Sequence, residues 1–494
     1  MVSDTHKTNQ WRTLDKDLNR FSRVEYATMH VSRPLVGVGI SLAFIVLAAL
    51  AAMVITGQSP GTLFIVAAAG FGAYMALNIG ANDVANNMGP AVGANALSMA
   101  GAIAIAAVCE SAGALIAGGD VVSTISKGII DPAGVADAQV FTWAMLSALL
   151  SAAIWVNIAT WLSAPVSTTH SVVGGVLGAG IAAAGLSAVN WPTMGGIAAS
   201  WVISPLLGGA IAAAVLAFIK WRIIYVEDKI AAARLWVPVL IGLMAGAFAA
   251  YLALKGLNRV ADIGLGHALA IGLAVGLAAW LVAIPAIRRQ SNAMENRNKS
   301  LKALFGFPLV ISAALLSFAH GANDVANAVG PLAAIVHAQG EGDFAATVAL
   351  PVWVMVIGAF GISFGLVLFG PKLIRMVGSQ ITKLNPMRAY CVALSAAVTV
   401  IVASWLGLPV SSTHIAVGGV FGVGFFREWH VERRVRKASM TQPATKRLPP
   451  EERRRRKLVR RSHFMTIVAA WVVTVPAAAA LSAVTFLVIR ALLG

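Results

Sequence analysis

Apolar segments recur along the whole chain and are separated by shorter polar stretches. A helix of about 20 apolar residues crosses the hydrocarbon core of a bilayer, whereas a membrane barrel shows short alternating segments. The pattern therefore predicts an all-α polytopic membrane protein with about 12–13 membrane segments. We expect these segments near residues 35–55, 62–90, 93–118, 139–162, 171–188, 196–219, 235–254, 262–285, 303–335, 350–370, 389–407, 411–426 and 464–490.

The polar stretches differ in charge. Lys and Arg are concentrated in the stretches 1–33, 220–234, 286–302, 371–388 and 427–462, whereas the remaining stretches carry few charges and lean acidic. Basic loops of membrane proteins lie on the cytoplasmic side. Placing all of these loops in the cytoplasm gives one self-consistent threading, with the N-terminus in the cytoplasm.

One polar motif occurs twice inside apolar sequence. Residues 80–90 read Gly-Ala-Asn-Asp-Val-Ala-Asn-Asn-Met-Gly-Pro, and residues 321–331 read Gly-Ala-Asn-Asp-Val-Ala-Asn-Ala-Val-Gly-Pro. The motifs contain Asp83 and Asp324, and their Gly, Asn and Pro residues weaken a helix on both sides of each Asp. In the threading, the two passages cross the membrane in opposite directions. We therefore expect each half of the chain to bring one carboxylate and an interrupted helix into the bilayer.

A second motif repeats with nearly the same spacing. Residues 165–170 read Pro-Val-Ser-Thr-Thr-His and residues 409–414 read Pro-Val-Ser-Ser-Thr-His, and a glycine-rich run follows each. A third echo relates Trp201 and Pro205 to Trp471 and Pro476. Inverted repeats of five passages with interrupted helices are typical of secondary transporters, whose site lies near the bilayer midplane.

These motifs divide the chain into four parts. We expect a cytoplasmic N-terminal arm and an extra span in 1–61, and the first transport repeat in 62–219. Joining spans and basic loops follow in 220–302. The second, inverted repeat occupies 303–490 and contains the cytoplasmic basic loop 427–462.

Composition and charge agree with a membrane protein. Hydrophobic residues make up 58% of the 494 residues and charged residues only 12%, whereas soluble domains carry about 25% charged residues. Both cysteines lie in apolar runs, so neither a disulfide framework nor a thiolate metal site is expected. The net charge of +17 is concentrated in the basic loop, which leaves no room for a nucleic-acid-binding domain. We expect that loop to contact anionic lipid headgroups near 427–462.

The residue types of the motifs suit a cation together with an oxyanion. A carboxylate at the centre of a membrane helix costs roughly 2.5–3.5 kcal/mol, so two of them indicate function. Carboxylate and amide oxygens suit cations. Hydroxyls and free backbone N–H groups that follow a Pro gather at a helix N-terminus, where anions bind. The inventory favours anion–cation symport, although hydroxyl motifs alone equally fit helix packing.

Other polar residues within the spans are open to more than one interpretation. Glu110 is either a cation ligand or a buried hydrogen-bonded acid, and alignment of the two halves places Gly361 at its position in the second half. His170 and His414 are interpreted as structural hydrogen-bonding residues. His320 precedes the second motif where Ile79 precedes the first, and we interpret it as a local departure from the repeat.

The paired Gly-Ala-Asn-Asp-Val-Ala-Asn and Pro-Val-Ser-(Thr/Ser)-Thr-His segments resemble those of the inorganic phosphate transporter (PiT) family. The resemblance covers roughly 62–219 and 303–490, and Ser412 stands where Thr is usual. It implies inverted repeats and the symport of phosphate with Na+ or H+. The resemblance further implies phosphate ligands at Asp83, Asn86, Ser167, Thr168, Thr169, Asp324, Asn327, Ser411, Ser412 and Thr413. It implies cation ligands at Asn82, Asp83, Asn323 and Asp324, to which we add Glu110 as a candidate.

We therefore predict a non-enzymatic phosphate symporter of the plasma membrane, with Na+ favoured over H+. We expect no cofactor besides the co-transported Na+ or H+. A sulfate or other oxyanion symporter of the same fold is the first alternative, and a homodimer is an open alternative for the assembly. An intramembrane aspartyl protease is the alternative from another class, because two membrane Asp residues could form a dyad. That enzyme would leave the paired Asn and hydroxyl residues without a role.

Overall fold

The chain is built from helices, as the sequence predicts. We describe it from a computed structural model, which covers residues 36–57, 61–131, 134–135, 137–162, 166–257, 263–340, 350–376, 384–439 and 461–493. Within these ranges, eleven helices are long and apolar enough to cross a membrane, and the only strand-like pairing is an isolated bridge between Ile130 and Val189. The N-terminal arm before residue 36 and most of the basic loop lie outside the described residues.

The first half of the chain and the joining segment follow an extra helix, Val36–Thr56. The first half contains α2 (Thr62–Asn82), α3 (Val84–Gly93), α4 (Met99–Ala117), α5 (Gly119–Ser123), the π-helical η1 (Thr124–Gly128), α6 (Ala138–Trp161), α7 (Thr168–Ala184), η3 (Leu186–Ala188), α8 (Trp191–Ile219) and η4 (Lys220–Ile224). The joining segment contains α9 (Lys229–Lys255), α10 (Leu265–Ser291) and α11 (Asn298–Leu304).

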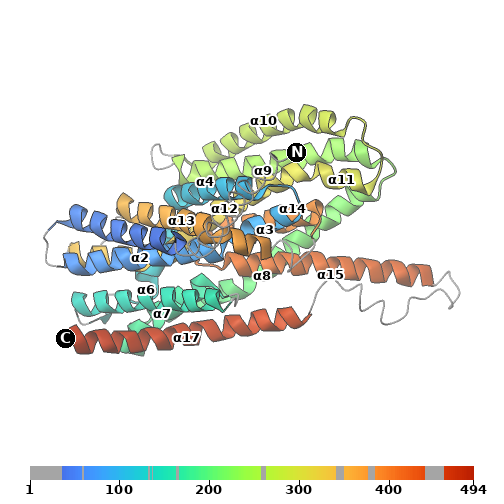
Figure 1. Ribbon diagram of the computed structural model, residues 1–494. Helices are drawn as coiled ribbons and strands as arrows, with labels where there is room; N and C mark the ends of the chain where they lie inside the picture. Colours follow the sequence, from blue (N-terminus) through green and yellow to red (C-terminus); the bar gives the residue numbers. More distant parts are fainter. Residues whose placement is uncertain are drawn as a thin grey trace, which may run out of the picture.

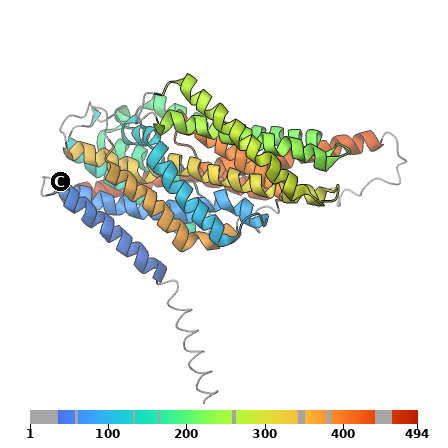
Figure 2. The ribbon, with the colours of Figure 1, turned by 90° about the horizontal axis from the view of Figure 1, so that it is seen from above.

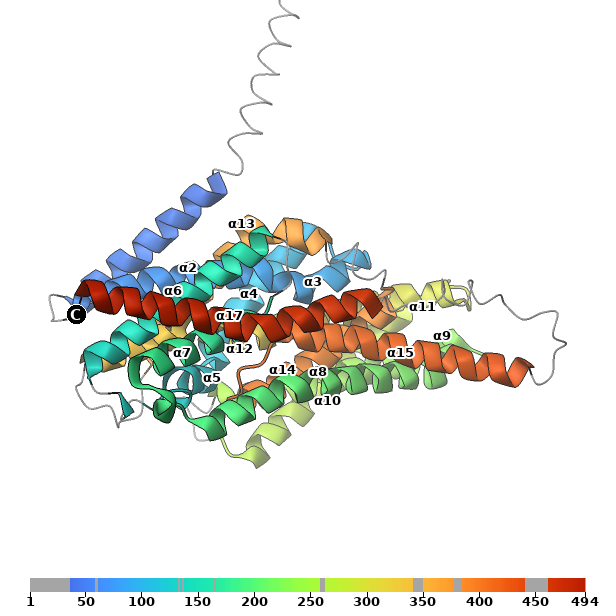
Figure 3. The ribbon, with the colours of Figure 1, turned by 90° about the horizontal axis from the view of Figure 1, so that it is seen from below.

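The second half contains α12 (Gly306–Gly340), α13 (Val352–Met376), α14 (Pro386–Trp405), α15 (Ser412–Ser439) and α17 (Arg461–Leu493). The helices form one bundle in which α15 extends beyond its neighbours (Figure 1). The hairpin of α9 and α10 lies along one edge of this bundle, as the view from above also shows (Figure 2). On the opposite face, α17 runs beside α6 and α7 (Figure 3).

The two halves pack against each other in reciprocal pairs. Helix α2 packs on α13 while α12 packs on α4, and α7 packs on α17 while α8 packs on α15. The matched glycines of the first motif make matched contacts: Gly80 abuts the carbonyl of Ile362, and Gly321 abuts the carbonyl of Glu110. Reciprocal packing is what two related repeats predict. Their inversion across the membrane and the proposed domain boundaries stay predictions.

This packing corrects the expected counterpart of Glu110. Because Gly80 contacts Ile362 in the way that Gly321 contacts Glu110, the residue that matches Glu110 is Ile362 rather than Gly361. The hydroxyls of Ser111 and Ser363, the next residue in each helix, lie 2.7 Å apart where α4 crosses α13. The second half therefore has an apolar side chain where the first half has a carboxylate.

The expected interruption of both motif helices is found in only one. Helix α2 ends at Asn82 and α3 begins at Val84, so the first motif is interrupted at Asp83. The second motif lies inside α12, which continues through Asp324. Ala is a better helix former than Asn, and the second motif has Ala328 where the first has Asn87. In the described part of each hydroxyl motif, residues 166–167 and 409–411 are non-helical, and α7 and α15 begin directly after them.

The close helix crossings predict that adding one methyl group at either motif glycine lowers the stability of the protein. Gly80→Ala and Gly321→Ala should each lower stability by about 1–3 kcal/mol, because the new Cβ would meet the backbone of the facing helix. Gly195→Ala in α8 is the matched control, since nothing lies near its Cβ. The control should keep or raise stability through helix propensity. Thermal unfolding of the purified protein in detergent measures this, and equal melting temperatures for all three variants would contradict the packing.

Candidate functional site

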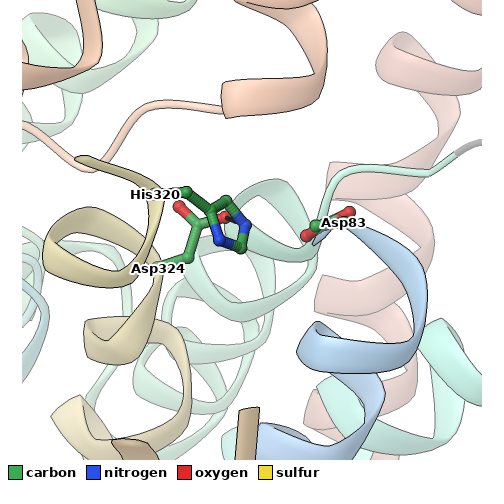
Figure 4. Close-up of side chains that lie close together, drawn as sticks. All are labelled: Asp83, His320 and Asp324. Atoms are coloured by element: carbon green, nitrogen blue, oxygen red, sulfur yellow. Dashed lines mark ion pairs between the residues drawn. The ribbon is translucent and has the colours of Figure 1, made fainter. Parts of the chain in front are cut away.

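The two motif carboxylates meet in the interior of the bundle. Asp83 lies at the junction of α2 and α3, and Asp324 lies in the middle of α12. Figure 4 shows that Asp324 and His320 project from one helix toward Asp83 on another. One oxygen or nitrogen atom from each of the three side chains lies within 4.8 Å of the other two. All three residues are buried, with at most 2% of their surface exposed.

A chain of polar contacts connects this cluster to α4. His320 Nδ1 lies 2.5 Å from Glu110 Oε2, and His320 Nε2 lies 2.8 Å from Asp324 Oδ2 as an ion-pair contact. The amide of Asn87 donates to Glu110 Oε1 at 2.9 Å. His320 is therefore not the local departure that the sequence interpretation made it, because it lies between two carboxylates. Glu110 is a buried hydrogen-bonded acid in this structure, which is one of its two interpretations.

The sequence offers one signal for these residues. His320, Asn87 and Glu110 all lie where the two halves differ, since their counterparts are Ile79, Ala328 and Ile362. Repetition identifies only positions that are the same in both halves, so it does not identify His320 or Asn87. Differences between the halves at the centre of the bundle mark the polar network.

The hydroxyl motifs donate to the carboxylates. Thr168 Oγ1 donates to Asp83 Oδ2 at 2.7 Å, and Thr413 Oγ1 lies 3.4 Å from Asp83 Oδ1. In the second half, Ser412 Oγ lies 3.4 Å from Asp324 Oδ2. The first-half carboxylate thus receives hydroxyls from both hydroxyl motifs. Among the described residues, Asp324 Oδ1 is buried and has no hydrogen-bond partner.

Two amide–hydroxyl contacts join the halves in a reciprocal way. Asn86 donates to Thr413 Oγ1 at 2.8 Å, and its counterpart Asn327 donates to Thr169 Oγ1 at 3.1 Å. Each contact joins the Asp motif of one half to the hydroxyl motif of the other half. The four motifs therefore form one site rather than two separate sites.

The serines that open the hydroxyl motifs cap helices. Ser167 accepts from the backbone N–H of His170 at 3.2 Å, and Ser411 accepts from that of His414 at 3.4 Å. The rings of the two His residues meet edge to face with centroids 4.5 Å apart. The N-termini of α7 and α15 thus approach each other inside the bundle, and a helix N-terminus favours an anion.

The Asn residues that precede each Asp hold the connections to the hydroxyl motifs. Asn323 donates to Ser404 Oγ and to the carbonyl of Leu408, and its side-chain oxygen accepts from the N–H of Val410. Asn82 donates to Asp83 Oδ1 at 3.1 Å and lies 3.5 Å from the carbonyl of Val166. In this structure, both side chains support the backbone around the site. Their expected role as cation ligands stays a prediction.

The donor set fits a cation and an oxyanion together. Three carboxylates and the amide oxygens are hard donors, which suit Na+ or another hard cation. The buried oxygens Asp324 Oδ1 and Asn327 Oδ1 have no donor among the described residues, so both are available to a cation. The hydroxyls and the two helix N-termini offer hydrogen-bond donors to an oxyanion.

Comparison with known proteins points to one class of substrate. The family model described as "Phosphate transporter family" matches residues 79–482. A relative from Helicobacter pylori strain J99, named "Putative phosphate permease", is 50% identical over 415 residues, which are 83% of this chain and 78% of the relative. A relative of the same description from Pyrococcus abyssi is 37% identical over 416 residues, covering 84% of this chain and 95% of the relative.

A solved structure has a similar fold. "The sodium-dependent phosphate transporter" is 34% identical to this chain and superposes with a TM-score of 0.78. The match covers 87% of this chain and 100% of that structure. The range matched by the family model, residues 79–482, contains both Asp motifs and both hydroxyl motifs.

The contacts of His320 with Glu110 and Asp324 predict a large loss of stability when the imidazole is removed. His320→Ala should lower stability by about 3–5 kcal/mol, because it leaves Glu110 and Asp324 buried without the imidazole between them. Adding Glu110→Gln and Asp324→Asn to this variant should restore most of the loss, because both carboxyl charges are then absent. The melting temperature in detergent reports both effects. An equal loss in the triple variant would mean that His320 acts through packing instead.

Proposed function

The chain belongs to the phosphate transporter family, and on this premise we propose that it imports inorganic phosphate by symport with a cation, Na+ in preference to H+. As a member of this family it is a transporter and not an enzyme, so the aspartyl protease alternative is set aside. One observation carries the proposal most directly. Two helix N-termini with hydroxyl motifs converge on two buried carboxylates, and reciprocal contacts join the motifs.

Electrostatics explains why the cation is needed. Two charged carboxylates with oxygens less than 5 Å apart repel each other by roughly 3 kcal/mol at an effective dielectric constant of 20. A phosphate anion beside Asp83 and Asp324 would add to that repulsion. A cation bound to the carboxylate oxygens offsets both penalties. We therefore expect the cation to bind before or together with phosphate.

The hydroxyl groups provide a second reason why cation binding and phosphate binding are coupled. The hydroxyl of Thr168 donates to Asp83, and that of Ser412 lies near Asp324. A hydroxyl has one proton to donate, so a donor that serves a carboxylate cannot also serve phosphate. A cation on the carboxylate takes over the role of the hydroxyl proton. The freed hydroxyls of α7 and α15 then become donors for the phosphate oxygens.

Na+ is favoured by the donor chemistry. Carboxylate oxygens with adjacent amide oxygens suit a bare cation, and the solved relative is named as sodium-dependent. The contact of His320 with Glu110 and Asp324 is the observation that favours H+ as the runner-up, because an imidazole between carboxylates can carry a proton.

The same carboxylates offer a basis for selecting phosphate over sulfate. Near pH 7, phosphate retains a proton that an ionised Asp can accept in a hydrogen bond, whereas sulfate has none to donate. Sulfate would place unprotonated oxygens against Asp83 or Asp324 and be repelled. The related sulfate symporter is the alternative that this argument disfavours.

The location and surroundings of the transporter are further parts of the proposal. The helices and the family support a multi-span membrane protein, and we propose the plasma membrane with a cytoplasmic N-terminus. Lys220 at the start of η4 lies over the ring of Phe426, and Arg433 in α15 lies over the ring of Trp429. Basic and aromatic side chains are typical of a membrane interface, which supports contact with anionic lipids near 427–462. A homodimer stays an open alternative.

The assignment of the carboxylates predicts matched losses. Asp83→Asn and Asp324→Asn should each reduce cation-driven phosphate uptake by at least about 100-fold, because each removes a charge that a cation must neutralise. Asp137→Asn is the matched control, since Asp137 caps α6 and Asn caps a helix equally well. Uptake of labelled phosphate into proteoliposomes is the measurement. Normal uptake by either site variant would mean that the two halves are similar in fold but that their carboxylates do not have equivalent roles in transport.

The coupling ion predicts how uptake depends on each gradient. Phosphate uptake should rise steeply with Na+ at constant pH, and the KM for phosphate should fall as Na+ rises, because the cation frees the hydroxyl donors. A proton gradient without Na+ should drive little uptake. Uptake that ignores Na+ but follows an inward proton gradient would assign the site to H+. Uptake of sulfate in place of phosphate would overturn the substrate.

A further inference from the structure

The turn that leads into the second hydroxyl motif is held at four consecutive carbonyl groups. Residues 407–410 follow α14 and precede Ser411, the cap of α15. Their carbonyls accept hydrogen bonds of 2.7–3.1 Å from four different helical elements. The donors are, in order, Thr124 of η1, Asn323 of α12, Trp201 of α8 and Thr169 of α7. Of these elements, α7 and α12 carry residues of the site, whereas η1 does not.

At Gly407 the turn lies in close contact with η1. Its φ of +67° is a left-handed conformation that suits glycine. A Cβ at Gly407 would lie 3.3 Å from Thr124 Oγ1 and 3.5 Å from the carbonyl oxygen of Asp120. The segment formed by α5 and η1 therefore packs directly against the turn. Asp120 and Thr124 are one helical turn apart, so a displacement of one displaces the other.

An ion pair anchors this segment to the joining hairpin. Asp120 in α5 pairs with Lys255 in the last turn of α9. The side chains are 44% and 21% exposed, and partly exposed pairs contribute little to global stability. The pair does join three parts of the protein in sequence: α9, the α5–η1 segment and the turn before α15. Its chief effect is thus on position.

We propose that Asp120 and Lys255 are a positioning pair that fixes the 407–410 turn and, through it, the phosphate-binding N-terminus of α15. This inference rests on the proposed transport of phosphate. It gives the α9–α10 hairpin, which lies outside the two repeats, a role in transport. Neither residue touches phosphate, and both act through Thr124 and the carbonyl of Gly407.

The test compares affinity for phosphate with stability. Asp120→Asn and Thr124→Val should each raise the KM for phosphate uptake by roughly three- to tenfold, with the maximal rate and the melting temperature little changed. Because both variants break one linkage, the double variant should raise KM no more than the larger single effect. The exchanged pair, Asp120→Lys with Lys255→Asp, should restore much of the affinity. Glu295→Gln is the matched control, because it breaks an exposed ion pair with Arg297 away from the turn.

Hydrogen exchange of residues 406–411 gives a readout that does not depend on the substrate. Exchange should be faster in Asp120→Asn and Thr124→Val than in the wild type and in Glu295→Gln, because the turn is less restrained. An unchanged KM with a lowered melting temperature, or additive effects in the double variant, would overturn the proposal. Absence of phosphate uptake by the wild type would instead reject the proposed function, while the exchange comparison would still decide whether the pair restrains the turn.

Discussion

Buried negative charge is the constraint on which the rest of this structure depends. Asp83, Glu110 and Asp324 are almost completely buried, and His320 is the only basic side chain among the described residues that pairs with any of them. One imidazole cannot neutralise three ionised carboxyl groups. Such a cluster persists in a bilayer only when hydrogen bonds, protons or cations compensate it. The amides and hydroxyls around the cluster supply part of that compensation, and a transported cation would supply the rest.

The N-termini of α7 and α15 supply part of the positive charge that offsets the buried carboxylates. Each helix N-terminus carries roughly half a positive charge from its peptide dipoles, and α7 and α15 direct theirs into the same interior region. These ends are well placed to stabilise the carboxylates as well as an anion. In the proposed mechanism the same hydroxyls serve either partner, so the strength with which they hold Asp83 affects how readily they become donors for phosphate. In the proposed mechanism, transport and stability therefore depend on the same hydrogen bonds.

Much of the fold and half of the site follow from the sequence, because the motifs are repeated. Repetition identified Asp83, Asp324 and both hydroxyl motifs, and the structure brings these residues together. It could not identify the contact of His320 with Glu110, which joins unlike residues 210 positions apart. The change from Asn87 to Ala328 favours a continuous α12, but propensity alone does not decide it, since tertiary packing against α4 also supports that helix. These features depend on contacts between different helices, and such contacts cannot be predicted from the local patterns of a single sequence.

The differences between the halves make the two carboxylates unequal. Asp83 accepts hydrogen bonds from Thr168, Thr413 and Asn82. Asp324 accepts one from Ser412, has His320 beside it, and has one carboxylate oxygen without a donor among the described residues. A cation at Asp83 must compete with three donors, while a cation at Asp324 meets an open oxygen next to a base. If each carboxylate holds a cation, the two cations would thus bind with different affinities. A transporter that loads its ions in a fixed order needs such a difference, and in this chain it arises where Ile79 and Ile362 are replaced by His320 and Glu110 in the opposite half.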